Sequence, residues 1–166
     1  MLVKTNALVD IAASPEVVFD FVTSLSNLPK VFRGFGQIPA IIKAEMADGG
    51  EMCEGGVRRI ENSDGSVIDE EMITFKKAER QTYRLVRGFK FPISLLIESG
   101  GDWQFTTTPK GTRIDWEFYF MLTSPVFYPV GLLLVQVFMQ KAMQQCLDNI
   151  QQSLANPSES IIWIIG

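Results

Sequence analysis

Three polar side chains on consecutive predicted strands have types and spacing that suit proton transfer or the anchoring of a ligand. Arg59 lies on one strand, Glu71 on the next and Tyr83 on the third. Glu71 shares the two-residue alternation of Phe75, and the turn at residues 62–65 pairs its strand with that of Arg59. Burial would raise the pKa of such a carboxyl group, and a tyrosine hydroxyl can orient a carbonyl. The pattern therefore predicts Glu71, Tyr83 and Arg59 as candidates for acid–base chemistry inside the fold.

This assignment depends on strand register, because consecutive residues of a strand point to opposite faces. A register that differs by one residue would turn Glu70 and Arg58 inward instead. A third interpretation makes Arg59 and Glu71 a structural ion pair at the rim of the sheet, with the Tyr83 hydroxyl at the surface. The three interpretations stay open, so the sequence alone assigns no catalytic residue.

Other kinds of site find no support in the residue types. The chain has no histidine, which excludes Ser-His-Asp and Cys-His nucleophilic sites and the commonest zinc ligand. Cys53 and Cys146 lie far apart without Cys-x-x-Cys spacing, which favours free thiols in a reducing compartment. We therefore expect no metal site and no cofactor. The basic residues are scattered, so we also expect no binding of nucleic acid.

The composition indicates one globular domain. The chain has 166 residues, of which 46% are hydrophobic and 20% charged, with a net charge of -4. A chain of this length buries a sizeable core without disulfides or metals. We place the domain at residues 1–155 and treat residues 156–166 as an apolar tail, either an edge strand, an oligomer contact or an expression artefact. The N-terminus lacks the pattern of a signal peptide, so we expect a cytoplasmic protein.

Periodicity predicts the order of the elements. A strand at residues 4–11 precedes the helix start Ser14-Pro15-Glu16, and a second short helix covers residues 28–32. Further strands are predicted at residues 41–46, 56–61, 67–76, 81–89, 97–107 and 112–122. A long helix is predicted from residue 126 to residue 154, with an apolar face formed by Leu132, Val135, Met139, Met143, Cys146 and Ile150.

Five short segments occur in the order and spacing of a known family. They are residues 14–19, 55–59, 64–71, 83–85 and 111–116, within a collinear match over residues 4–154. In them the chain resembles the START/Bet v 1-like (SRPBCC) superfamily and its bacterial polyketide cyclase/dehydrase-like branch. The resemblance implies an α+β helix-grip fold, in which a curved antiparallel sheet of six or seven strands wraps a long C-terminal helix. It also implies a cavity between sheet and helix, but members include cyclases, carriers and receptors, so it does not fix the function.

Residues on the presumed concave face and on the facing helix are the predicted ligand contacts, although each could instead be plain core. They are Phe75, Tyr83, Leu85, Trp103, Phe105, Trp116, Phe118, Val135, Met139 and Met143. We expect an apolar, lipid-like or aromatic, small molecule to bind there, with the protein acting as a carrier or sensor. The alternatives are a polyketide cyclase/dehydratase-like enzyme and a protein-interaction module.

The helix start is apolar on nearly all sides, which predicts contacts beyond the core. Residues 130–139 are too few for a membrane span, which needs ~20 apolar residues. We therefore expect no stable membrane insertion. A homodimer contact through residues 126–139 or through the tail is the favoured interpretation, and transient contact with a membrane surface is the other.

Overall fold

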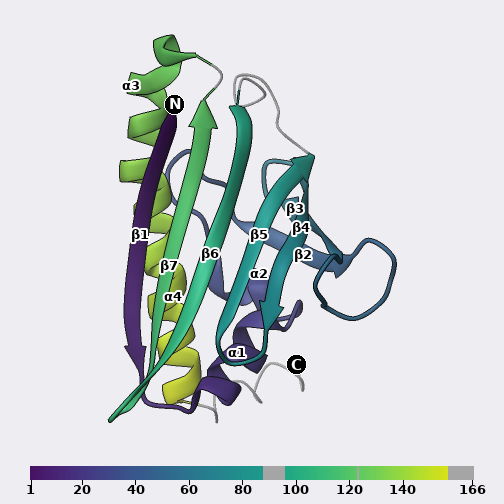
Figure 1. Cartoon of the computed structure of the whole chain (residues 1–166), viewed down its shortest axis with the longest axis vertical. Helices are drawn as coiled ribbons and strands as arrows, with labels where there is room; N and C mark the ends of the chain where they lie inside the picture. The colour runs from purple at the N-terminus through teal and green to yellow at the C-terminus, as the bar shows by residue number, and fades with distance from the viewer. Residues whose placement is uncertain (88–95, 123, 157–166) are drawn as a thin grey trace.

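The chain forms one antiparallel sheet with helices packed against it, as the computed structural model in Figure 1 shows. Residues 1–87, 96–122 and 124–156 are described, for residues 96 and 97 the backbone alone. The strands are β1 (Leu2–Ile11), β2 (Ile41–Met46), β3 (Val57–Asn62), β4 (Val67–Lys76), β5 (Arg80–Arg87), β6 (Leu96–Thr108) and β7 (Gly111–Leu122). The helical elements are α1 (Pro15–Thr23), α2 (Leu28–Val31), η2 (Pro125–Phe127), α3 (Tyr128–Leu133), η3 (Leu134–Met139) and α4 (Gln140–Ala155).

The sheet is open and its strands follow the order β1-β7-β6-β5-β4-β3-β2. All neighbouring pairs are antiparallel, and β1 pairs with β7 along its whole length, from Leu2 opposite Met121 to Ile11 opposite Thr112. The C-terminal helix runs along β1 and β7 (Figure 1), while α1 packs near one end of β6 and β7 and α2 lies next to β2. The predicted α+β helix-grip fold is confirmed, with seven strands.

The long C-terminal helix differs in one respect from the prediction. It begins with the 3₁₀ turn η2 and is interrupted by η3, a turn of π-helix, before α4 continues it to Ala155. A π turn holds its hydrogen bonds across five residues instead of four, and spacing of apolar residues gives no signal for it. Its last residue, Met139, faces the cavity described below.

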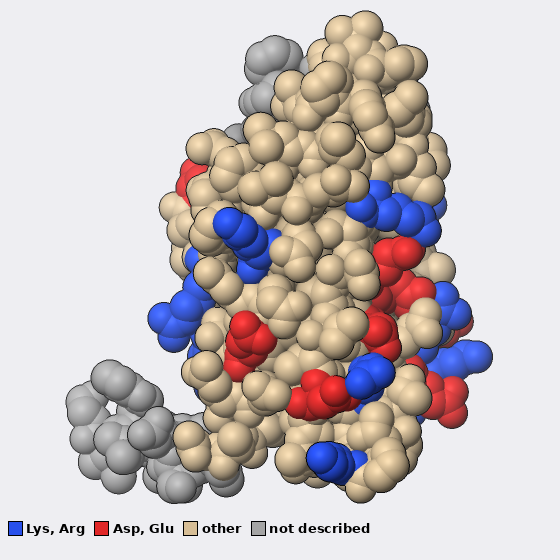
Figure 2. Space-filling view, turned by 90° about the vertical axis from the view of Figure 1, so that its left-hand side faces the viewer, with Lys and Arg blue, Asp and Glu red and all other residues tan. Residues whose placement is uncertain are grey.

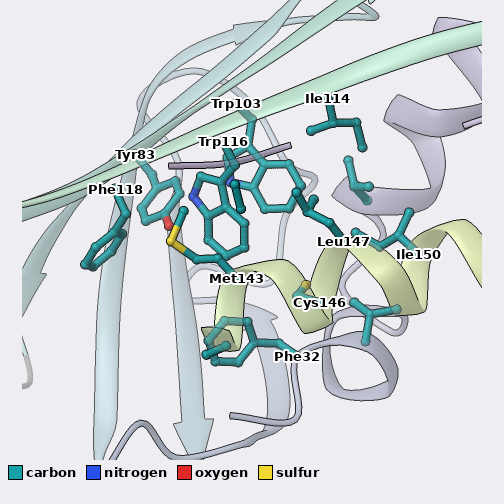
Figure 3. Close-up of a cluster of buried hydrophobic side chains, with 14 of the residues drawn as sticks. Phe32, Tyr83, Trp103, Ile114, Trp116, Phe118, Met143, Cys146, Leu147 and Ile150 are labelled. Carbon is teal, nitrogen blue, oxygen red and sulfur yellow. The ribbon is translucent and has the colours of Figure 1, made fainter. Parts of the chain in front are cut away.

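The core lies between the sheet and α4. Alternate residues of β7 are buried, which confirms the inner face predicted for Ile114, Trp116, Phe118 and Phe120 and adds Thr112 and Leu122 to it. The buried residues of α4 are Ala142, Met143, Cys146, Leu147 and Ile150. Figure 3 shows the last four of them facing Ile114, Trp116 and Phe118. Cys146 is buried and Cys53 exposed, and both thiols are free, as the sequence predicted.

The start of α1 follows its sequence signal. The Ser14 hydroxyl accepts a hydrogen bond from the Val17 backbone N–H at 3.4 Å, and Pro15 occupies the first helical position. This helix buries Val18 and Phe19 against the sheet.

The start of the C-terminal helix carries an exposed apolar surface. Val126, Val130, Leu133 and Val137 are 80%, 57%, 52% and 39% exposed. The sequence has no charged residue between Glu117 and Lys141, and Figure 2 shows this end of the molecule without charged side chains on the face toward the viewer. Taken by length and composition alone, the helix Pro125–Ala155 could cross a membrane. Its buried residues on α4 are part of the core, but only 22% of the apolar window that meets this criterion is buried in the fold.

Candidate functional site

A cavity of about 110 Å³ lies between the inner face of the sheet, α2 with the loop after it, and the η3 turn. Six of the predicted ligand contacts line it: Tyr83, Leu85, Trp103, Trp116, Phe118 and Met139. Twelve further residues complete the lining: Val22, Leu28, Phe32, Ile38, Pro39, Ile41, Arg58, Ile60, Asn62, Ile68, Glu70 and Gln81. The walls are therefore mostly apolar or aromatic, with a few polar side chains, as in typical small-molecule sites.

Four predicted contacts lie elsewhere in the core. Phe75 and Phe105 pack on Phe19 of α1, each with its ring centroid 5.2 Å from that of Phe19. Val135 and Met143 are fully buried and do not line the cavity. Their apolar spacing places them correctly on the inner faces, but it cannot distinguish a residue at the cavity from one packed beside it.

The charged residues at the cavity are Arg58 and Glu70. The strands therefore adopt the second of the two registers that the sequence left open. Arg58 is 5% and Glu70 7% exposed, and they are paired across β3 and β4. The Arg58 guanidinium donates from Nε at 2.9 Å and from Nη2 at 2.5 Å, both to Oε2 of Glu70. The two formal charges thus cancel at the cavity wall.

The prediction of an inward Glu71 and Arg59 is wrong. Arg59 donates to Asp69 at 2.8 and 2.9 Å, and Arg84 donates to Glu71 at 2.8 Å, on the opposite face of the sheet. A bulge in β4 explains the error: Met72 pairs with Tyr83 but Thr74 pairs with Thr82, which leaves one extra residue between them.

The same bulge lies between Glu71 and Phe75, whose shared two-residue alternation was the basis for predicting an inward Glu71. Glu71 and Phe75 have the same sequence parity, but they face opposite sides because the extra residue lies between them. On β3, Arg58, Ile60 and Asn62 are the buried residues, so two polar side chains occupy the inner face. No hydrophobic pattern could have indicated that.

Tyr83 belongs to the polar end of the cavity. It is 6% exposed, and the guanidinium carbon of Arg58 lies 5.7 Å from the centre of its ring. Burial, and then the nearby Glu70 carboxylate, raise the pKa of Tyr83 well above its usual range, against the lowering effect of Arg58 and of the Trp116 and Trp103 indoles. Tyr83 is therefore a neutral phenol at physiological pH, able to donate a proton in a hydrogen bond but unsuited to act as a base.

A glycine on the neighbouring strand makes room for the Tyr83 ring. Gly101 is paired with Tyr83 across β5 and β6, and a Cβ atom there would lie 2.5 Å from the tyrosine oxygen. Only the absence of a side chain allows this close approach. Gly101 therefore fixes how the ring lies along the inner face.

A short loop before β2 closes one side of the cavity and contacts the C-terminal helix. Phe35 and Ile38 form a two-residue bridge, and Ile38 lines the cavity. The Phe35 ring packs on Phe138 at 6.4 Å between centroids, and Lys141 Nζ lies 5.1 Å from its centre. Gly36 adopts a positive φ of 58°, and a Cβ there would lie 2.4 Å from the Phe138 ring. The loop and the helix thus form one continuous wall.

Two buried polar atoms at the cavity have no partner. In the described part of the chain, Gln81 Oε1 and Trp116 Nε1 are the buried side-chain polar atoms without a hydrogen bond. Trp116 lies beside Tyr83 and stacks on Trp103 with 4.2 Å between ring centroids (Figure 3). Residues 1–87, 98–122 and 124–156 contain no group of three His, Cys, Asp or Glu side chains that could hold a metal ion.

Residues 3–155 match a family model described as "Polyketide cyclase / dehydrase and lipid transport". The chain belongs to this family. Comparison with curated protein sequences gives no match. The family covers ligand-binding and cyclase roles, and the resemblance recognised in the sequence is confirmed.

Solved structures with little sequence identity share the fold of this family member. Ara h 8.0201 has 16% identity and a TM-score of 0.66, with 94% of this chain and 99% of that chain covered. Protein MLL2253 from Mesorhizobium loti has 15% identity and a TM-score of 0.68, covering 93% and 98%. The di-domain ARO/CYC StfQ from the steffimycin biosynthetic pathway has 12% identity and a TM-score of 0.71, covering 95% of this chain and 52% of that one.

Proposed function

We propose that this protein binds an apolar, ring-containing small molecule between the sheet and the C-terminal helix, as a carrier or sensor. The observation that carries the proposal is a mostly apolar cavity whose charged pair, Arg58 and Glu70, is already neutralised from within. Such a site can bind a ligand through burial of apolar surface and through complementary shape. It has no uncompensated charge that could stabilise a charged transition state.

The size of the cavity favours an aromatic ligand over a long lipid. Its volume is about 110 Å³, which is comparable to an apolar protein cavity of ~150 Å³ that binds benzene. The stacked rings of Trp103 and Trp116 provide a flat wall against which another ring can pack. Met139 on the opposite side can adapt to different shapes, because methionine is unbranched and polarizable.

Filling the cavity by mutation tests this function. Ile68→Phe adds a ring at the lining, whereas Ile73→Phe adds the same ring to a 45% exposed position on the same strand. Binding of single-ring aromatic compounds, measured by calorimetry, should fall at least ~10-fold for Ile68→Phe and stay unchanged for Ile73→Phe. Equal affinity in both variants would place the ligand outside this cavity.

A cyclase or dehydratase is the second candidate, favoured by the buried cluster of Glu70, Arg58 and Tyr83. A carboxyl group and a neutral phenol at one end of an apolar cavity could move protons in a bound β-polyketone. In that case Tyr83→Phe should abolish ring closure or dehydration of a β-polyketone probe while its binding persists. Unaltered turnover in Tyr83→Phe would eliminate that role for the phenol.

A further inference from the structure

The two unpartnered polar atoms of the cavity indicate what a ligand must supply. Gln81 is 2% and Trp116 4% exposed, and both line the cavity. Gln81 Oε1 is an acceptor and Trp116 Nε1 a donor, and neither makes a hydrogen bond of good geometry within the protein, although the Trp116 indole lies near enough to the Tyr83 hydroxyl to oppose the rise of its pKa. Buried polar groups are almost always hydrogen-bonded, so each unsatisfied group calls for an explanation such as a bound molecule.

These two atoms belong to one level of the sheet. Gln81 on β5 is paired with Trp103 on β6, which is paired in turn with Trp116 on β7. The backbones of Gln81 and Trp116 are therefore two strand spacings apart, roughly 10 Å. The Trp103 ring lies between them and stacks on that of Trp116. The donor thus belongs to the pair of stacked indoles, and the acceptor belongs to the strand next to Trp103.

The charges at the cavity exclude a charged ligand. Arg58 and Glu70 bond to each other, and no uncompensated cation or anion is found among the lining residues. An ionised ligand would lose its hydration without gaining an opposite charge, which is strongly unfavourable.

We propose that the cavity selects a neutral single-ring compound that carries both a hydrogen-bond acceptor and a hydrogen-bond donor. The acceptor of the ligand accepts a hydrogen bond from the indole N–H of Trp116, and its donor donates a hydrogen bond to Gln81 Oε1. The ring of the ligand packs against the indoles of Trp103 and Trp116. This inference rests on the proposed function, because it concerns the chemistry of a ligand in the same cavity.

Four probes of nearly equal shape test the inference by calorimetry at neutral pH. Ethylbenzene has neither polar group, acetophenone has the acceptor, 4-ethylphenol has a hydroxyl, and 4-hydroxyacetophenone has a carbonyl and a hydroxyl at opposite ends. We expect 4-hydroxyacetophenone to bind tightest, at least ~5-fold tighter than ethylbenzene. The anionic 4-hydroxybenzoate should not bind measurably. Acetophenone should also shift the indole N–H resonance of Trp116.

Gln81→Met tests the acceptor, because methionine has a similar shape and cannot accept strongly. The variant should fold at least as stably as the parent, since it removes an unsatisfied buried group. It should lose the preference for 4-hydroxyacetophenone over acetophenone. Gln104→Met is the matched control, since Gln104 lies exposed on the other face of the sheet, and it should keep the preference. Trp116→Phe should remove the preference for acetophenone over ethylbenzene.

The outcomes separate the two proposals. If ethylbenzene binds as tightly as the polar probes, or if Gln81→Met keeps the parent's selectivity, the cavity binds rings but the polar inference is wrong, and ordered water satisfies the two atoms. If none of the four probes binds, the proposed function fails for ring compounds and the inference falls with it.

Discussion

Arg58 donates two hydrogen bonds to a single oxygen of Glu70 while both side chains lie buried beside an apolar cavity. Removing two charges from water is costly, and the pair compensates for that cost only while both partners are present. Loss of one partner leaves an uncompensated charge in the protein interior. Replacing one member of the Arg58–Glu70 pair should therefore lower the free energy of unfolding strongly.

Glu70→Gln should lower the free energy of unfolding by about 3 kcal/mol or more, because it leaves the Arg58 charge buried without its counterion. Denaturant titration followed by tryptophan fluorescence measures the change. The double replacement Arg58→Met with Glu70→Leu should recover most of the stability, since apolar side chains of similar volume need no compensation.

The neighbouring residue provides the control for Glu70. Glu71→Gln is the same substitution one position along β4, but it affects a solvent-exposed pair with Arg84 on the opposite face. Such exposed pairs contribute little to stability. A loss for Glu71→Gln as large as that for Glu70→Gln would contradict the assignment of the two residues to opposite faces.

The overall fold could be predicted from sequence because its signals are local and repeat along the chain. The alternation of Ile114, Trp116 and Phe118 determines a strand face without reference to anything else, and Ser14-Pro15 marks a helix start. The order of such elements then matches one family.

The site was predicted less well because its decisive features are not periodic. A single extra residue in β4 places Glu71 on the face opposite to Phe75, contrary to the prediction for Glu71, and Arg58 faces inward on a strand with weak hydrophobic alternation. Gln81, which has no apolar character, was missed altogether. The tail prediction for residues 157–166 lies outside the described residues.

Gly101→Ala should disturb the cavity by displacing Tyr83. The added Cβ would lie 2.5 Å from the tyrosine oxygen and 2.6 Å from Cζ, so the ring has to move. We expect a loss of ~1–3 kcal/mol in unfolding free energy, as for other overpacked sites. Tyr83→Leu removes the obstructing ring. The double variant Gly101→Ala, Tyr83→Leu should therefore lose less unfolding free energy than the sum of the losses in the two single variants.

Gly56→Ala is a control with comparable crowding but a movable neighbour. A Cβ at Gly56 would lie 2.7 Å from the terminal methyl of Met46, a flexible side chain, and 3.1 Å from the backbone oxygen of Cys53, a milder contact. Its loss of stability should be smaller than that of Gly101→Ala. Additive losses in the Gly101→Ala, Tyr83→Leu pair would show that the glycine is needed for another reason.

The exposed apolar face at the start of the C-terminal helix gives a prediction about assembly. We expect a homodimer through Val126, Val130 and Leu133, because contiguous exposed apolar surface is typical of protein contacts. Light scattering should report a dimer for the parent and a monomer for Leu133→Glu. Ile42→Glu, on β2 and 58% exposed, is the control and should leave the dimer intact. A monomeric parent would contradict this prediction.

Asp69 should make the protein sensitive to acid. Its side chain is 8% exposed, and the two hydrogen bonds from Arg59, followed by the charge of that guanidinium, hold the pKa of Asp69 below its usual value of 3.8 despite some desolvation. Above about pH 5 the carboxylate is ionised in both the folded and the unfolded chain, so its full contribution to stability is present. As the pH falls, the unfolded chain binds the proton first, and this contribution is lost until the folded carboxyl is protonated as well.

Asp69→Asn should therefore be less stable than the parent at pH 7, and the difference should shrink as the pH falls from about 5 toward 3. Urea titrations at several pH values measure it. Asp10→Asn is a useful comparison, because Arg113 also lowers the pKa of Asp10 but their pair is exposed and screened by salt. Added salt should therefore reduce the effect of Asp10→Asn more than that of Asp69→Asn. A constant difference between parent and Asp69→Asn at all pH values would mean that Asp69 contributes through packing and not through its charge.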